Sequence, residues 1–281
     1  MLTKLLAPLA AALSRVGSHG TLILAGSIFV GLDLPGLTSV FKPYLGPAIV
    51  FMLILAFLRV DPAEMRRHWT RPGLIAAAVV WCMLVVPAVM CTLALALGVG
   101  HHMPGLFFML VLQLSAPGLI SSPAVSALLG LKLFAIIAGS ALTAMIVRRL
   151  AGSAFIEAQR ERIDGLSVLA MALFAIAAMD GVAGHIRSSP LLVLGLLVLG
   201  FVLALGQIAV TAFVFRPAGR ARAFAIGLIA ASRNMGLMLT ATGFGVPEVA
   251  RLYFALAQFP IYLLPHLLKP LAQRVQIEPA D

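Results

Sequence analysis

The 281-residue chain is strongly apolar, with 62% hydrophobic residues, 11% charged residues and a mean hydropathy of +1.08. Soluble domains carry about 25% charged residues, so this composition excludes a soluble protein and predicts an all-α, polytopic membrane protein. The net charge of +10 is spread over short loops. This distribution is typical of loops that follow the positive-inside rule, and it argues against a nucleic-acid partner.

The apolar runs predict nine membrane spans, preceded by an interfacial lead-in helix over residues 1–19. Lys4 and Arg15 flank an apolar patch in this lead-in, and we favour an interfacial helix there over a secretory signal. The predicted spans cover residues 20–37, 43–60, 73–98, 105–129, 132–150, 164–184, 190–215, 222–244 and 249–268.

Basic residues around 59–71, 148–162 and 216–222 each predict a cytoplasmic loop. Five predicted spans lie between the first and the last of these stretches. An odd number of crossings would put the two stretches on opposite sides of the membrane. Either one span between 132 and 184 does not cross, or one basic loop is translocated.

Two predicted spans contain helix-breaking and polar residues near their middles. The span 105–129 contains Pro117, Gly118, Ser121 and Ser122. The span 222–244 contains Ser232, Arg233 and Asn234. Paired broken helices are typical of secondary transporters. Unwound backbone at this depth is tolerated only where it is buried in protein or lines a cavity.

Three stretches resemble the bile acid:sodium symporter family. They are Leu53–Arg59 with Arg66–Pro72, Ala116–Pro123 and Ala231–Leu237. The resemblance implies an inverted-repeat transporter with a panel domain and a core domain in which two broken helices cross. We expect the first repeat at 20–150, with its broken helix at 105–129. The second repeat is expected at 151–281, with its broken helix at 222–244, and is one helix short.

The family's oxygen ligands to sodium fall largely on residues that cannot bind a hard cation. The resemblance places its glutamate on Ile229, its glutamine on Arg233 and its asparagine on Pro123. Cys82 takes the place of a further glutamine. Hard cations require oxygen ligands, so we expect family-type sodium coupling to be lost. The residual ion-site positions are Ser122, Ser140, Cys82 and Ile229.

Arg233 is the central candidate residue for solute binding. An arginine at a helix centre costs about 2.5–3.5 kcal/mol on insertion scales, and its guanidinium stays charged. An anionic solute would provide a bidentate partner; the alternative is an arginine that snorkels or caps a helix C-terminus. The predicted substrate-binding set is Arg233, Asn234, Ser122, Ser121, Pro117, Gly118 and Ser232.

These features predict a secondary transporter or facilitator of small organic anions, working by alternating access in a bacterial inner membrane. Asp33 and Asp180 are candidates for proton coupling, or else interfacial caps. The expected partners are the solute and the lipid bilayer, with no cofactor or metal. The alternatives are an arsenite- or auxin-type carrier, a proton-coupled efflux carrier and a non-transporting membrane scaffold. No hydrolase or metalloenzyme motif supports an enzyme.

Overall fold

The computed structural model describes residues 11–60, 72–107, 110, 123–232, 236, 240 and 245–277. Every regular element in these ranges is a helix. Five of the described helices are long and apolar enough to cross a membrane, namely Pro35–Arg59, Pro72–Ala96, Leu131–Ala151, Arg160–Ser188 and Pro190–Val214. The protein is therefore an all-α, multi-pass membrane protein, which confirms the class predicted from composition.

The chain forms two compact units. Unit 1 contains residues 1–68 and 131–183, and unit 2 contains residues 69–130 and 184–281. Each unit therefore combines segments from both predicted repeats. Both predicted broken spans belong to unit 2.

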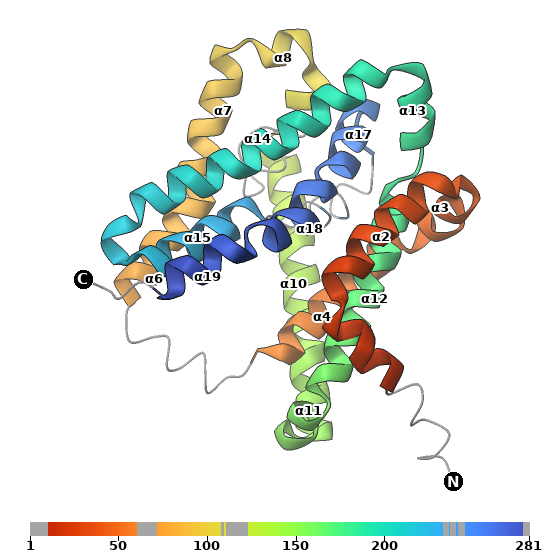
Figure 1. Cartoon of the computed structure of the whole chain (residues 1–281), viewed down its shortest axis with the longest axis vertical. Helices are drawn as coiled ribbons and strands as arrows, with labels where there is room; N and C mark the ends of the chain where they lie inside the picture. Colours follow the sequence, from red (N-terminus) through yellow and green to blue (C-terminus); the bar gives the residue numbers. More distant parts are fainter. Residues whose placement is uncertain are drawn as a thin grey trace. The chain divides into compact units, whose positions relative to one another are not determined.

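Unit 1 is built around one central helix, α12 (Arg160–Ala178). The helices α2 (Gly20–Asp33), α3 (Pro35–Phe41) and α4 (Leu45–Arg59) pack against it (Figure 1). The unit also contains η1 (Lys42–Tyr44), α11 (Ser153–Ala158) and residues 131–151 of α10 (Pro123–Ala151).

Two close approaches bring the N-terminal helices onto α12. A Cβ atom at Gly31 would lie 2.8 Å from the carbonyl oxygen of Ile176, so only glycine lets α2 approach this closely. At Gly165, a Cβ atom would overlap the backbone of Leu13. Leu13 belongs to the helix 11–18, which meets the following helix, 22–33, at 90°. The assignment of residues 1–19 as an interfacial lead-in stays a prediction, and residues 1–10 lie outside the described ranges.

Two ion pairs fasten α4 to α12, one between residues just beyond the start of α4 and the end of α12, and one at their other ends. Lys42 Nζ lies 2.7 Å from Asp180 Oδ2, and Arg59 Nε lies 2.7 Å from Asp164 Oδ1. These pairings make the two helices antiparallel. Arg148 of α10 donates hydrogen bonds to the carbonyl oxygens of Leu58 (2.5 Å) and Val60 (2.8 Å). The described basic residues Arg59 and Arg148 therefore lie at one end of that unit.

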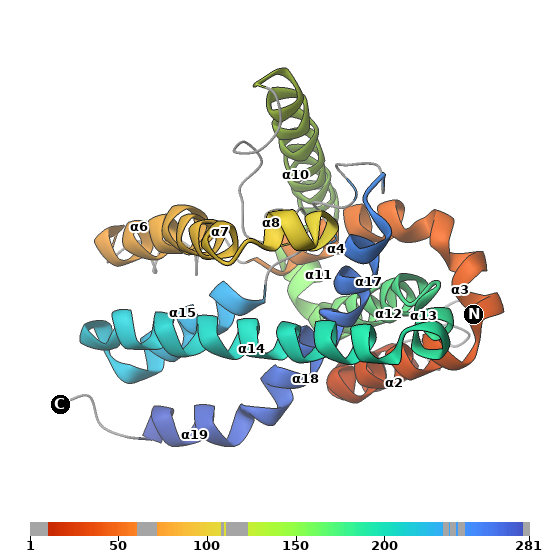
Figure 2. The ribbon, with the colours of Figure 1, turned by 90° about the horizontal axis from the view of Figure 1, so that it is seen from above.

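Unit 2 is organised along α14 (Pro190–Val214). On one side of α14 runs a continuous rod of α6 (Pro72–Val80), η2 (Trp81–Val85) and α7 (Val86–Ala96). Figure 2 shows that α14, α15 (Arg220–Ala231) and α19 (Lys269–Ile277) lie side by side. The remaining elements are α8 (Val99–His102), α13 (Val182–Ser188, which crosses from unit 1), η3 (Arg216–Ala218), α17 (Glu248–Leu256) and α18 (Gln258–Leu267).

The rod runs antiparallel to α14. Trp81 Nε1 donates a hydrogen bond to Thr211 Oγ1 (2.9 Å), and further along, Val89 and Val202 line one cleft. The start of the rod therefore lies at the same end of unit 2 as the last residues of α14. The basic stretch that precedes Pro72 and the one that follows Val214 leave from this same end. With both of these chain ends on one side of the membrane, an even number of crossings separates them, and this favours the alternative in which one of the five predicted spans does not cross; the number of spans stays a prediction.

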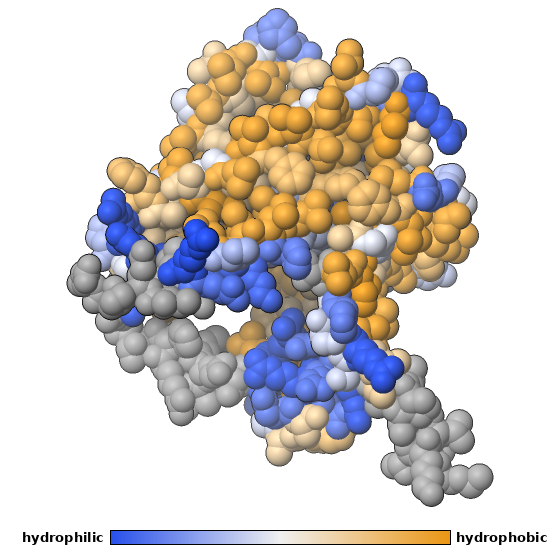
Figure 3. Space-filling view, in the orientation of Figure 1, coloured by the Kyte–Doolittle hydropathy of each residue, from blue (hydrophilic) through white to orange (hydrophobic). Residues whose placement is uncertain are grey.

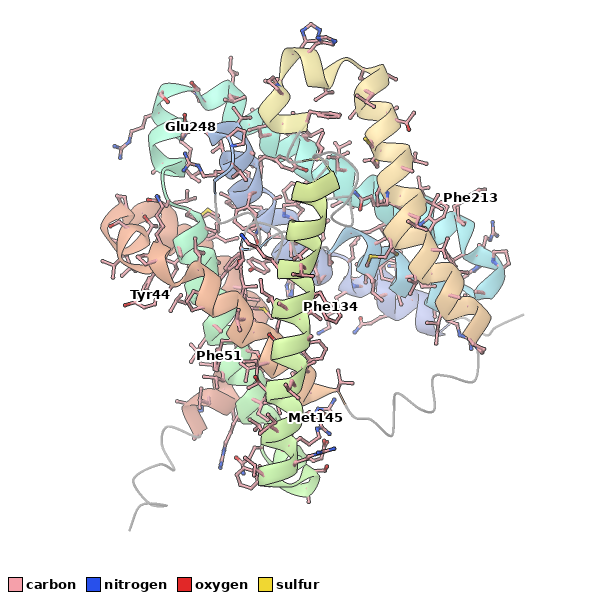
Figure 4. All side chains as sticks on the ribbon, turned by 180° about the vertical axis from the view of Figure 1, so that it is seen from behind. Tyr44, Phe51, Phe134, Met145, Phe213 and Glu248 are labelled. Atoms are coloured by element: carbon pink, nitrogen blue, oxygen red, sulfur yellow. The ribbon has the colours of Figure 1, made fainter. Side chains whose placement is uncertain are left out.

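The surface of the helices matches a hydrocarbon environment. Figure 3 shows an apolar surface over α14 and a hydrophilic one around α11. Large apolar side chains project outward from the helices, as Figure 4 shows for Phe134 of α10 and Phe213 of α14. These two side chains are 71% and 76% exposed. Such exposure is stable when the solvent is lipid.

The antiparallel packing in unit 2 predicts which residues share a side of the membrane. In a background with Cys82→Ala and Cys91→Ala, single cysteines can be introduced as Gly73→Cys, Ala221→Cys and Ser188→Cys. A membrane-impermeant maleimide should label Gly73→Cys and Ala221→Cys from one side, because both lie at the basic end of unit 2. Ser188→Cys, at the opposite end of α14, should be labelled from the other side. Labelling of Gly73→Cys and Ala221→Cys from opposite sides would contradict the arrangement.

Candidate functional site

Only some of the predicted site residues belong to the described part of the chain. Those outside it are Pro117, Gly118, Ser121, Ser122, Arg233 and Asn234. The structure describes Pro123 through its backbone, as the first residue of α10. It places Cys82, Ile229 and Ser232 in unit 2, and it places Asp33, Ser140 and Asp180 in unit 1.

The second predicted break follows a helix that is too short to cross the membrane. The helix α15 has 12 residues, which span about 18 Å at 1.5 Å per residue. A hydrocarbon core is about 30 Å thick. Because α15 begins at the basic end of unit 2, with Arg220 and Arg222, it ends within the apolar layer.

Packing against α14 sets the depth at which α15 ends. A Cβ atom at Gly227 would lie 2.9 Å from the carbonyl oxygen of Ile208, so the two helix backbones nearly touch there. Ala231, the last residue of α15, belongs to the same buried cluster as Ala204. Ala204 lies ten residues before the end of the 25-residue helix α14. The chain therefore leaves the helix near the middle of α14.

The backbone changes direction at Ser232. This residue has φ −93° and ψ 61°, outside the helical region, while its N–H still donates to the carbonyl oxygen of Leu228 (2.9 Å). Gly236 and Thr240 are helical again, and Thr240 Oγ1 donates to the carbonyl oxygen of Gly236 (2.9 Å). One turn before the break, Ile229 is 67% exposed and presents only hydrocarbon.

Cys82 lies in a wide π-helical turn formed by Trp81–Val85. The N–H of Val86 bonds to the carbonyl oxygen of Trp81, five residues earlier. Pro87 follows directly, and its ring would clash with the carbonyl of residue 83 in a regular α-helix. The wider turn accommodates the proline, and such turns are frequent at functional sites. Cys82 itself is buried at 8% exposure.

The same turn is anchored to α14 by Trp81. Besides the hydrogen bond to Thr211, its ring meets that of Phe215 edge-on, with centroids 6.0 Å apart and an interplanar angle of 81°. Thr211 is fully buried. The rod is therefore held against α14 by a polar contact inside an apolar layer, which the sequence analysis did not anticipate.

The polar candidates of unit 1 have different environments. Ser140 is 2% exposed, and its Oγ has no hydrogen-bond partner among the described residues. Asp180 pairs with Lys42 and accepts a weak hydrogen bond from Thr38 Oγ1 (3.4 Å). Asp33, the last residue of α2, is exposed. Asp180 therefore links its own segment to the segment that contains Thr38 and Lys42. Proton coupling by Asp33 or Asp180 stays a prediction.

Two polar features of unit 2 escaped the sequence analysis. His185 Nε2 lies 3.1 Å from Glu248 Oε1, and Glu248 is the only acidic residue in the described part of unit 2. Gln207 is buried in α14 at 7% exposure. A lone amide inside the long apolar run Pro190–Val214 was a signal that could have been found, whereas the pairing of His185 with Glu248 depends on tertiary packing.

Comparison with known proteins does not assign the chain to a family. No family model matches the chain, and no curated protein matches it. The candidate site therefore stands on its own geometry. Its described elements are the end of α15 near the middle of α14, the non-helical Ser232 and the wide turn that contains Cys82.

The contact at Gly227 predicts a measurable effect of one methyl group. Gly227→Ala should force α15 away from the Ile208 carbonyl and cost about 1–3 kcal/mol, as overpacking does. A fall in the melting temperature of the purified protein in detergent would report this cost. Gly195→Ala is the matched control, because a Cβ atom there meets nothing within 4 Å. Equal melting temperatures for both variants would show that α15 does not rest on α14 at this point.

Proposed function

We propose that this protein is a secondary transporter or facilitator of small organic anions, of the bile acid:sodium symporter type. The observation that carries the proposal is the end of α15 within the apolar layer, followed by the non-helical Ser232. A multi-pass protein gains nothing in stability from a helix that ends there, because the last carbonyl groups lose their helical partners. Such ends are typical of the solute sites of transporters.

The next residue after Ser232 in the sequence is Arg233, the central candidate for solute binding. The carbonyl end of α15 carries a partial negative charge, which stabilises a cation near it. No described carboxylate of unit 2 competes for this arginine, because Glu248 pairs with His185. In this proposal the guanidinium fork binds a carboxylate or sulfonate bidentately.

The division into two units supports a mechanism of alternating access. Both predicted broken spans belong to unit 2, whereas unit 1 contains both ends of the first predicted repeat and the start of the second. In this mechanism the solute site belongs to one unit, and movement against the other unit opens it to each side in turn. The proposal includes the inverted-repeat arrangement and a location in a bacterial inner membrane.

The described positions that replace sodium ligands argue for transport without family-type sodium coupling. Ile229 and Cys82 carry no side-chain oxygen, and sodium binds oxygen ligands by analogy with other hard cations. A fixed guanidinium takes over the role of balancing the charge of the solute. The carrier then needs no sodium ion to bind an anion.

Arg233→Gln should abolish the binding of taurocholate and pyruvate, two probes for organic sulfonates and carboxylates. A ligand that binds the folded state raises the melting temperature, so each probe should stabilise the unchanged protein and leave Arg233→Gln unaffected. Arg233→Lys should rescue binding only in part, because a point charge cannot replace a bidentate fork.

The matched control is Arg222→Gln, which removes an arginine at the other end of α15 whose Nη1 bonds to the Ala218 carbonyl oxygen. This variant should keep full binding. If Arg233→Gln lowers the melting temperature without changing the response to the probes, Arg233 is a structural cap and the proposal fails. Stabilisation by arsenite alone would favour the arsenite-type carrier, and no response to any solute would favour the scaffold.

Replacement of sodium by potassium or choline should leave the binding of these probes and their uptake into proteoliposomes unchanged. The reason is the absence of side-chain oxygens at Ile229 and Cys82. Ile229→Glu, which restores the carboxylate of the family pattern, provides a comparison within the same chain. A steep dependence of the unchanged protein on sodium would refute the loss of coupling.

A further inference from the structure

A cleft of about 280 Å³ lies between the rod α6–η2–α7 and α14, entirely within unit 2. Trp81, Gln207 and Thr211 provide its polar groups. Its apolar lining includes Val85, Val89, Val202, Leu203 and Val210. At about 30 Å³ for a water-sized group, the cleft accommodates roughly nine or ten non-hydrogen atoms.

One polar group of the cleft has no partner. The indole N–H of Trp81 and the Thr211 hydroxyl bond to each other. Gln207 is more than nine-tenths buried, and its Oε1 has no hydrogen-bond partner among the described residues. An unbonded buried amide oxygen is unfavourable by at least 1 kcal/mol in protein interiors.

The side chain of Gln207 lies on the face of α14 that looks onto the rod. Leu203, Gln207 and Thr211 follow one another at four-residue spacing, so they share a helix face. Thr211 of this row contacts Trp81 of the rod. Gln207 lines the cleft, and the terminal torsion of a glutamine is broad, so its amide can rotate to meet a hydroxyl bound there.

The rim of the cleft is hydrocarbon. Val89, Val202 and Val210 are each more than half exposed. In a membrane such side chains contact lipid, which gives apolar molecules access to the cleft from the bilayer. A charged ligand is unsuitable, because the described lining contains no charged side chain that could compensate it.

We propose that this cleft binds an apolar alcohol of about nine or ten non-hydrogen atoms, or the hydroxyl-bearing end of a longer one. Its chain packs against the valines, and its hydroxyl donates a hydrogen bond to Gln207 Oε1. An alkane or an ester fills the same volume but has no donor for this oxygen. The cleft shares Trp81 and Val85 with the wide turn that contains Cys82, but the proposal does not depend on anion binding.

Trp81 provides a direct readout, because it lines the cleft and the chain has only one other tryptophan, Trp69. In the variant Trp69→Phe, Trp81 is the only tryptophan, so all tryptophan fluorescence comes from the cleft. In lipid nanodiscs, 9-bromo-1-nonanol should quench Trp81 fluorescence saturably. The bromoalkane of the same length, 1-bromononane, should quench weakly and without saturation, because it lacks the hydroxyl.

Gln207→Leu keeps the side-chain volume but removes the hydrogen-bond acceptor. It should raise the concentration of 9-bromo-1-nonanol that gives half-maximal quenching about tenfold, the loss expected for one buried hydrogen bond. The matched control is Gln258→Leu in the Trp69→Phe background. Gln258 is also a buried glutamine of unit 2, but its Nε2 donates to the Phe254 carbonyl oxygen (3.1 Å). This control should retain saturable quenching by the alcohol.

Two results would overturn the proposal. The first is equal quenching by the bromoalcohol and the bromoalkane, which indicates partition into the bilayer only. The second is unchanged saturation in Gln207→Leu. A near-normal melting temperature of Gln207→Leu establishes that the variant is folded. We expect this result because leucine is at least as stable as an unbonded glutamine in apolar surroundings. Anion binding, measured separately, should be the same in both glutamine variants.

Discussion

A peptide group inside the hydrocarbon layer must be hydrogen-bonded or shielded by the protein itself, because no water is present to solvate it. The end of α15 is the point at which this requirement is most severe, since a helix terminus leaves carbonyl groups without helical partners. The structure meets it by packing the helix closely on α14 through Gly227 and Ala231. This contact sets the depth at which α15 ends.

The helix α14 supports both halves of unit 2. On one side it receives α15 through backbone contact at Gly227, where the absence of a side chain allows the close approach. On the other side it holds the rod through the hydrogen bond from Trp81 to Thr211. Small residues and interhelical hydrogen bonds are the usual means of helix association in lipid, where apolar burial provides little driving force.

Unit 1 is fastened differently. Two of its ion pairs lie at or next to the ends of α4 and α12, and their side chains are partly exposed. Exposed pairs contribute about 0–1 kcal/mol, so they fix the register of the helices more than their stability. Polar groups within the apolar layer are rarer and cost more, so the buried Gln207 of unit 2 is the described residue at which we propose a ligand.

The sequence by itself determined the membrane class, most of the long helices and the position after which α15 ends, because hydropathy and helix-breaking residues act locally. It also singled out Cys82 and Ser232, but not their surroundings. The antiparallel pairing of the rod with α14 and the contacts of Trp81 and Asp180 were decided by tertiary structure. Each of these depends on which helix faces meet, and in a chain that is apolar on nearly every face the sequence pattern does not distinguish a face that meets lipid from one that meets protein.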